Sequence, residues 1–184
     1  MNRIKIRILT VSALCIALNV VGSNLALLLK LPIYLDSMGT LLAAAMFGPL
    51  AGMAVGGLTG LFVGVTTDLY SLFFLPIQLV LGLLAGLAFR RLSPSKLSHN
   101  WWLALVIALP GTLLSTLITV QFFGGITSSG SSLLVQLLLG TGLSKTAAVL
   151  LIQVGTDYLD RLVSLTVVGL AYRVIQRRLP DLSH

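Results

Sequence analysis

The stretch FGPLAG, residues 47–52, interrupts an apolar segment that runs over about 37–67. A single helix over this segment would be about 46 Å long, too long for a hydrocarbon core of about 30 Å without strong tilt. Proline removes one helical hydrogen bond and restricts the residue before it. Gly48-Pro49 therefore predicts two short helices in place of one long helix, and this break decides how many times the chain crosses a membrane.

The composition is that of an integral membrane protein. Of the 184 residues, 57% are hydrophobic and 9% are charged, whereas an ordinary soluble domain carries about 25% charged residues. The length predicts a single domain over 1–184. The net charge of +7 does not indicate a nucleic-acid partner, because basic residues in a membrane protein more often reflect its topology.

The remaining apolar segments complete the count of spans. They cover about 74–89, 101–122 and 146–172, and the apolar N-terminal run up to Leu29 is interpreted as an uncleaved first helix. With the break at Gly48-Pro49, the sequence predicts an all-α bundle of six transmembrane helices. Residues 132–143 are too few for a seventh span and predict a re-entrant or interfacial helix.

Basic residues orient these six spans. Nine of the 12 Lys and Arg residues then fall on one side of the membrane, which the positive-inside rule assigns to the cytoplasm. Without the break, two of the three basic clusters would move to the opposite face. We therefore expect both termini to be cytoplasmic. The clusters are Arg3, Lys5 and Arg7; Arg90, Arg91 and Lys96; and Arg173, Arg177 and Arg178.

The last apolar segment carries polar residues at helical spacing. Steps of three and four residues place them on one face of a helix, and each buried charge costs about 2.5–3.5 kcal/mol to insert. Such residues usually face a bundle interior or a wet cavity, which favours a functional site. A purely structural ion pair between Asp157 and Arg161 is the alternative, and both interpretations can hold together. The residues are Lys145, Gln153, Asp157, Asp160, Arg161 and Ser164.

Small residues recur every four positions in three other segments. The spacing of Gly52, Gly56, Gly60 and Gly64, repeated by Gly82 and Gly86, indicates close packing of helices within the bundle. Ala13 and Ala17 repeat the spacing in the first helix, where a small-residue face can equally dock a partner helix.

The sequence offers no pattern of catalysis or metal binding. The stretch GTGLSKT, residues 140–146, lacks the glycine positions of a phosphate-binding loop. His99 and His184 have no acidic or cysteine neighbours, and the single Cys15 can form neither an intrachain disulfide nor a cysteine metal site. We therefore expect no enzyme activity, no cofactor and no metal.

Five motifs follow one another along nearly the whole length of the chain. They are A-x-x-x-A at Ala13 and Ala17, LPIYLDSMGT (31–40), FGPLAGMAVGGLTGL (47–61), TDLYSLFFLP (67–76) and DYLDRLVS (157–164). In their order and spacing they resemble the substrate-binding S components of energy-coupling factor (ECF) vitamin transporters, most closely the hydroxymethylpyrimidine and pyridoxine branch.

This resemblance implies a binding subunit in the cell membrane with its site facing outside. Such a subunit binds a small vitamin and associates with a transmembrane coupling subunit and two ATPases. Ala13 and Ala17 would then contact the coupling subunit. Asp36 would belong to the loop over the pocket, where it either caps the second helix, which we favour, or contacts the ligand. The expected substrate-binding residues are Asp36, Gln78, Gln121, Lys145, Gln153, Asp157 and Arg161.

Two other functions remain open at this stage. One is a self-sufficient proton-coupled carrier, because aspartates beside Arg161 could relay protons, and it would transport without any ATPase partner. The other is a membrane scaffold of the cell-wall assembly type, which would bind no small molecule.

Overall fold

The structure is a computed structural model, and it describes residues 3–94 and 96–178. Within these ranges the chain forms helices and loops and has no strand. Asp181 and His184 lie outside the described residues. The helices in chain order are α1 (Arg3–Leu28), α2 (Met38–Phe47), α3 (Pro49–Thr66), α4 (Tyr70–Phe73), α5 (Leu75–Phe89), the 3-10 helix η1 (Leu97–His99), α6 (Asn100–Phe123), α7 (Ser131–Leu139) and α8 (Lys145–Arg178).

The predicted helix break at Gly48-Pro49 is confirmed. Helix α2 ends at Phe47, and α3 begins at Pro49, which occupies the first turn where a missing N–H costs nothing. Gly48 between them has φ 86°, a backbone conformation that favours glycine. The two short helices can therefore change direction within a single residue.

Glycines allow α3 and α5 to pack with their backbones close together. A Cβ on Gly52 would lie 2.9 Å from the carbonyl oxygen of Gly82, and one on Gly56 would lie 2.8 Å from the carbonyl oxygen of Gln78. Both distances are shorter than real Cβ contacts allow. The prediction that these glycines serve packing inside the bundle is confirmed.

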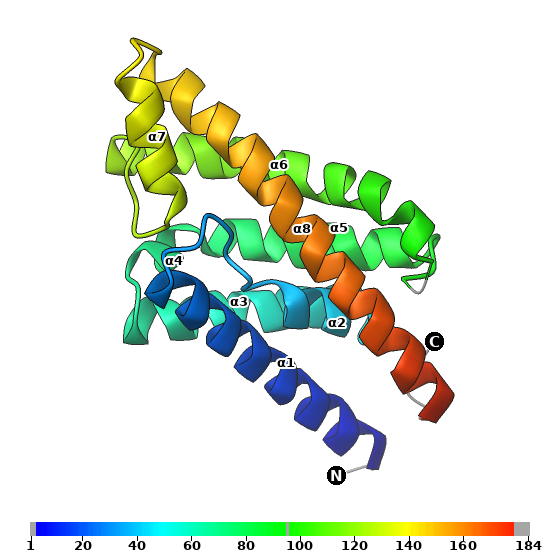
Figure 1. Cartoon of the computed structure of the whole chain (residues 1–184). Helices are drawn as coiled ribbons and strands as arrows, with labels where there is room; N and C mark the ends of the chain where they lie inside the picture. The colour runs from blue at the N-terminus through cyan, green and yellow to red at the C-terminus, as the bar shows by residue number, and fades with distance from the viewer. Residues whose placement is uncertain (1–2, 95, 179–184) are drawn as a thin grey trace.

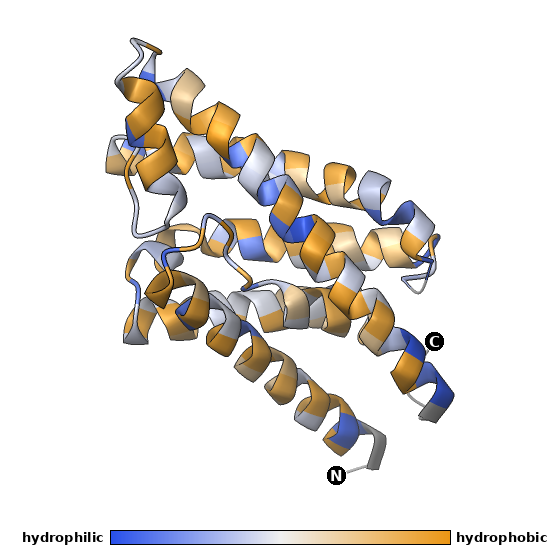
Figure 2. Cartoon of the chain, viewed as in Figure 1, coloured by the Kyte–Doolittle hydropathy of each residue, from blue (hydrophilic) through white to orange (hydrophobic). Residues whose placement is uncertain are grey.

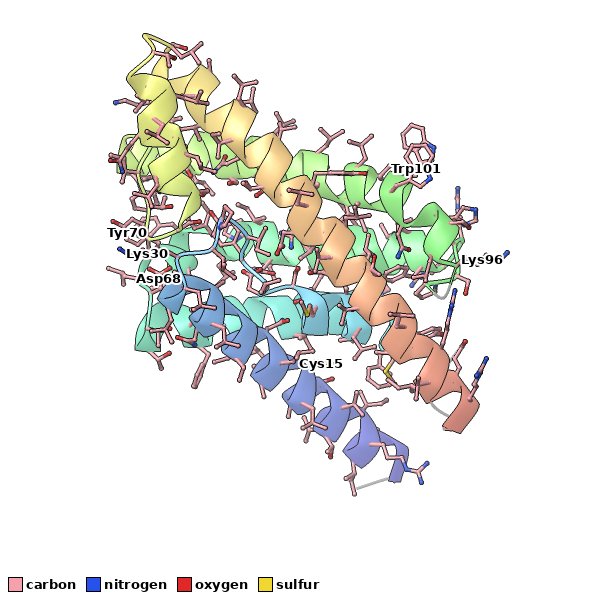
Figure 3. All side chains as sticks on the ribbon, viewed as in Figure 1. Cys15, Lys30, Asp68, Tyr70, Lys96 and Trp101 are labelled. Atoms are coloured by element: carbon pink, nitrogen blue, oxygen red, sulfur yellow. The ribbon has the colours of Figure 1, made fainter. Side chains whose placement is uncertain are left out.

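The bundle has two chemically different ends. Both termini lie at one end (Figure 1), together with Lys96, whereas Lys30, Asp68 and Tyr70 lie at the other (Figure 3). We call the first the basic end, because the three basic clusters of the sequence lie next to the two chain ends and in the 90–96 turn. We call the second the loop end; it is formed by loop 29–37, α4 and the segment 124–130.

The surface of the helices suits a lipid environment. Three helices in the described ranges are long and apolar enough to cross a membrane by length and composition, at Lys5–Leu28, Pro49–Thr66 and Leu97–Phe123, and α2 and α5 are shorter apolar helices. Large side chains such as Leu14 and Leu113 are exposed on their outer faces, and Figure 2 shows mostly hydrophobic ribbons interrupted by a hydrophilic stretch in the middle of α8.

Helix α2 lies at the centre of the bundle and contacts α1, α3, α5 and α8. Its residues Leu41 and Ala44 join a buried apolar cluster with Leu81, Leu103 and Leu165. Leu103 and Leu165 come from the halves of α6 and α8 that approach the basic end, and Leu81 lies near the middle of α5. The apolar core therefore closes the basic end, and polar side chains gather in the other half.

Candidate functional site

A cavity of about 80 Å³ lies in the loop-end half of the bundle. Loop 29–37 and the segment 127–129 border it, together with α1, α3, α5, α6 and α8. Its volume is several times the minimum needed to hold one water molecule, about 10–15 Å³. Apolar walls with a few polar groups are the usual construction of a small-molecule site. The charged and amide side chains of the lining are Asp36, Asp68, Gln78, Asp157 and Arg161.

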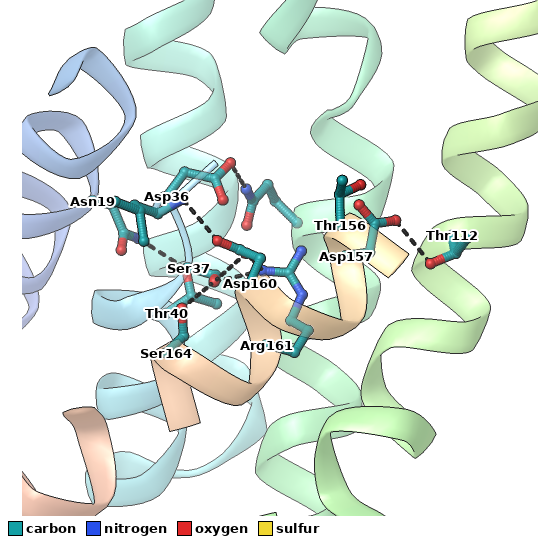
Figure 4. A network of polar contacts seen from close by, with 12 residues as sticks. Asn19, Asp36, Ser37, Thr40, Thr112, Thr156, Asp157, Asp160, Arg161 and Ser164 are labelled. Carbon is teal, nitrogen blue, oxygen red and sulfur yellow. Dashed lines mark hydrogen bonds and ion pairs between the residues drawn. The ribbon is translucent and has the colours of Figure 1, made fainter. Parts of the chain in front are cut away.

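Helix α8 supplies one charged wall of the cavity. Asp157 and Arg161 are one helical turn apart, and each is only 7% exposed. The Thr112 hydroxyl of α6 donates to Asp157 Oδ2 at 2.8 Å, as Figure 4 shows. The α8 stripe therefore faces the interior, in agreement with its helical spacing.

The alternative interpretation, a structural ion pair between Asp157 and Arg161, is wrong. Arg161 Nη1 donates instead to Asp160 Oδ2 at 2.8 Å and to the Ser37 hydroxyl. The reason is that the guanidinium extends toward loop 29–37, where the neighbouring Asp160 also points. The spacing of four residues would allow Arg161 to pair with Asp157. The contact of Arg161 with loop 29–37 instead directs it to Asp160.

Asp160 fastens loop 29–37 to α8. Its side chain is fully buried, its Oδ1 accepts the Leu35 backbone N–H at 2.8 Å, and its Oδ2 accepts the Arg161 guanidinium. Leu35 has φ 53°, a conformation that is unfavourable for a leucine, and its N–H is the group that Asp160 binds. The ion pair thus also determines the path of the loop (Figure 4).

Asp36 belongs to the cavity and does not cap α2. Ser37 is the capping residue, with no side-chain hydrogen bond to the helix, so the favoured interpretation of Asp36 was wrong. Gln78 Nε2 donates to Asp36 Oδ2, while Asp36 Oδ1 and Gln78 Oε1 are buried without a hydrogen-bond partner. Burial raises the pKa of the Asp36 carboxyl to about 6, and the nearby Arg161 guanidinium opposes this rise.

The structure brings together Asp36, Gln78, Asp157 and Arg161 from the residues predicted for the site. Gln153 is buried but lies outside the cavity lining: it accepts a hydrogen bond from Thr116 and donates one to Thr119 of α6. Gln121 and Lys145 are exposed and do not line the cavity.

Other polar residues of the site were missed from the sequence. Tyr34 lines the cavity beside Asp36, and burial raises its pKa to about 12, so its phenol is neutral at pH 7. Thr112 and Ser115 face the cavity from α6. Their three-residue spacing was the available signal, but hydroxyl residues are common in transmembrane helices and carry little information alone.

Asn19 was also missed, although it stands in an apolar run. It is fully buried, and its amide donates to Thr40 and Thr59 and accepts the backbone N–H of Gly39. This single side chain joins α1 to the first turn of α2 and to α3. A buried amide in an apolar helix needs such partners. Asn19 within an apolar run could therefore have been identified from the sequence as a residue that bonds to neighbouring helices.

A second set of contacts covers the cavity beside loop 29–37, which the segment 124–130 touches where Gly130 meets the Lys30 carbonyl. The Ser128 hydroxyl donates to Asp68 Oδ2 at 2.9 Å, joining the segment 124–130 to the turn before α4. The rings of Tyr70 and Phe73 pack against the ring of Phe123, and their centroids lie 4.7 Å and 5.1 Å, respectively, from the Phe123 centroid. Both covers of the cavity are therefore loops held by a few polar or aromatic contacts.

Comparison with protein families gives one match over most of the chain. The model of the family "ECF transporter, substrate-specific component" matches residues 7–172. Comparison with curated proteins and with solved structures gives no significant match. The match agrees with an apolar helical bundle that encloses a small polar cavity. The chain therefore belongs to the substrate-specific components of ECF transporters, membrane proteins that bind a small-molecule substrate and work with the subunits of an ECF module.

Proposed function

We propose that the chain captures a small water-soluble vitamin, or a vitamin precursor, at the outer face of the cell membrane and delivers it to a transmembrane coupling subunit energised by two ATPases. Pyridoxine and hydroxymethylpyrimidine are the first candidates. The observation that supports this most strongly is the polar cavity buried at the loop end, opposite the three basic clusters.

The proposed orientation follows from the charge distribution. Helices α1, α2, α3, α5, α6 and α8 would form six spans, with the basic end in the cytoplasm by the positive-inside rule. The loop end would then face outward. In this arrangement loop 29–37 and the segment 124–130 lie between the cavity and the outside.

The proposed partner face is the outer side of α1. Ala13 and Ala17 are exposed there, and small residues allow a second helix to approach closely. Because the cavity lies on the inner side of α1, substrate and coupling subunit would occupy opposite sides of the same helix.

Mass spectrometry of the detergent-purified protein tests the binding role. We expect a small water-soluble molecule to be released on denaturation from the wild type and from Gln121→Ala, which changes an exposed amide outside the cavity. Uptake of that molecule should require co-expression of the coupling subunit and both ATPases. Uptake by the chain alone would instead indicate a self-sufficient carrier, and absence of any bound molecule would indicate a scaffold.

A further inference from the structure

The acidic residues of this basic protein are concentrated at the cavity. The net charge is +7, and the sequence contains five acidic residues, all aspartate. Asp36, Asp68 and Asp157 line the cavity, and Asp160 pairs with the lining residue Arg161. The fifth, Asp181, lies outside the described residues. All acids that the structure describes therefore lie at or beside one small cavity.

Arg161 balances this charge only in part, because its ion pair is with Asp160, although its guanidinium lies near enough to lower the pKa of Asp36. Its Nη1 also donates to the Ser37 hydroxyl, so the guanidinium is directed toward the loop. No other Lys, Arg or His contributes to the described lining. Asp36 and Asp157 consequently lack an ion-pair partner within residues 3–94 and 96–178. A buried carboxylate without a countercharge is costly unless something neutralises it.

Two buried acceptor atoms also lack donors. Gln78 is 6% exposed, and its Oε1 and the Asp36 Oδ1 have no hydrogen-bond partner. The orientation of the amide is fixed, because its other end must donate to Asp36 Oδ2. A ligand that satisfies these atoms must therefore present N–H or O–H groups.

The remaining walls suit a flat ring. Tyr34 and Phe74 line the cavity together with the apolar side chains of Ile33, Val63 and Ile77. Aromatic side chains stack on flat rings, and their faces attract cations. An aromatic cation would therefore match both the walls and the charge.

We infer that the cavity takes a heteroaromatic ring with a cationic amine, whose N–H groups bind Asp36, Gln78 and Asp157. The ring lies against Tyr34 and Phe74, and the ligand charge replaces the missing countercharge of the two aspartates. This inference rests on the proposed function and narrows its substrate class to positively charged, donor-bearing rings, so within that class it favours a cationic amine such as pyridoxamine over the first candidates, pyridoxine and hydroxymethylpyrimidine.

Three compounds on one ring test the assignment. Pyridoxamine, pyridoxine and 4-pyridoxate differ in a single substituent, which is an amine, an alcohol and a carboxylate respectively. Calorimetric titration of the detergent-purified full chain at pH 7.5 should show pyridoxamine binding at least tenfold more tightly than pyridoxine, with no binding of pyridoxate. Asp36→Asn and Asp157→Asn should each narrow this difference, whereas Gln121→Ala should retain it.

The wild-type ranking alone decides the matter, so a variant that fails to fold does not obscure the result. Equal or tighter binding of the alcohol or the carboxylate would overturn the assignment, as would the absence of binding by all three compounds. These results remain separate from the proposed function, because a small molecule of another class recovered from the purified chain would still support a substrate-binding subunit.

Discussion

Two buried glutamines, Gln78 and Gln153, have opposite hydrogen-bonding situations. Gln153 has a partner at each end of its amide, Thr116 and Thr119. Gln78 has one partner, Asp36, and an unpaired oxygen beside the cavity. The first arrangement stabilises the contact between α6 and α8, whereas the second leaves a group for a ligand. Burial alone would not distinguish these roles.

The two glutamines therefore predict different effects on ligand affinity. Gln153→Ala should lower the melting temperature of the empty protein, because it leaves buried threonine hydroxyls unpaired at about 1–3 kcal/mol, with little change in ligand affinity. Gln78→Ala should also lower the melting temperature, because it removes the hydrogen bond to Asp36 Oδ2, but it should in addition weaken binding of the co-purified ligand about tenfold, or ~1.4 kcal/mol. Thermal unfolding and calorimetry of both variants check this, and an identical pattern in the two would contradict it.

Asp36 predicts a pH dependence of cation binding. Its pKa is raised to about 6 by burial, while Arg161 lowers it and Asp160 and Asp157 raise it. Protonation removes the charge that a cation needs, so affinity for pyridoxamine should be highest above pH 7 and fall as the pH drops through 6. If one carboxyl group titrates, the affinity for pyridoxamine should fall by at most tenfold for each pH unit below about 6. Asp36→Asn should reduce the pH dependence of the affinity, and an affinity that rises as the pH falls would contradict the proposed role of Asp36.

At the scale of elements, the path of loop 29–37 depends on its attachment to α8. Asp160 accepts hydrogen bonds from the Leu35 N–H and from the Arg161 guanidinium. Arg161 also donates a hydrogen bond to the Ser37 hydroxyl. The loop is therefore positioned from a helix more than a hundred residues later in the chain. No local sequence pattern reports such a contact.

Asp160→Asn should loosen this attachment. The variant keeps the shape of the side chain but leaves Arg161 buried without its counter-ion, a change worth about 3–5 kcal/mol for a buried pair. We expect a lower melting temperature and faster ligand dissociation, measured by thermal unfolding and stopped-flow release. Ser164→Ala, which removes only a 3.3 Å hydroxyl contact to Ser37, serves as the control and should change both quantities much less.

The outer face of α1 predicts a separation of binding from transport. Ala13→Trp or Ala17→Trp should abolish uptake by the assembled transporter, because a bulky ring prevents close approach of a partner helix. Ligand affinity of the isolated chain should stay nearly unchanged, since both positions are exposed away from the cavity. Equal loss of uptake and affinity would show that these alanines are not a docking face.

The sequence predicted the elements better than their contacts. The break at Gly48-Pro49 and the packing of Gly52 and Gly56 follow from local stereochemistry, and both were confirmed. The alternative pairing of Arg161 with Asp157 and the capping interpretation of Asp36 were wrong, because helical spacing defines a face of one helix and not the loop that packs on it. Gln121 is exposed and does not line the cavity, and no sequence pattern indicated this, because an amide in an apolar helix needs a partner only if it is buried.

At the scale of the whole molecule, charge is separated along the bundle. The basic clusters follow the termini and the 90–96 turn, whereas the described acids gather in the other half around the cavity. A membrane protein with this separation has one end suited to the cytoplasm and another suited to a cationic solute.

Cysteine labelling in intact cells checks the orientation. In a Cys15→Ala background, which removes the single native thiol, a membrane-impermeant maleimide should modify Lys30→Cys and leave Lys96→Cys unmodified. Both positions are exposed in the structure, so a difference between them reports sidedness and not burial. Modification of position 96 from outside would overturn the six-span topology, and labelling after membrane permeabilisation confirms that the thiol is reactive.

The three hydrogen bonds of Asn19 have a mechanical consequence. Loop 29–37 leads without interruption into α2, and the first turn of α2 is bonded through Gly39 and Thr40 to the inner side of α1. The carbonyl of Cys15 leaves no room for even a methyl group on Gly39, so the two helices cannot slide past each other freely at this point. A displacement of the loop that moves the first turn of α2 must therefore either break the Asn19 bonds or move α1, and with α1 the surface that carries Ala13 and Ala17.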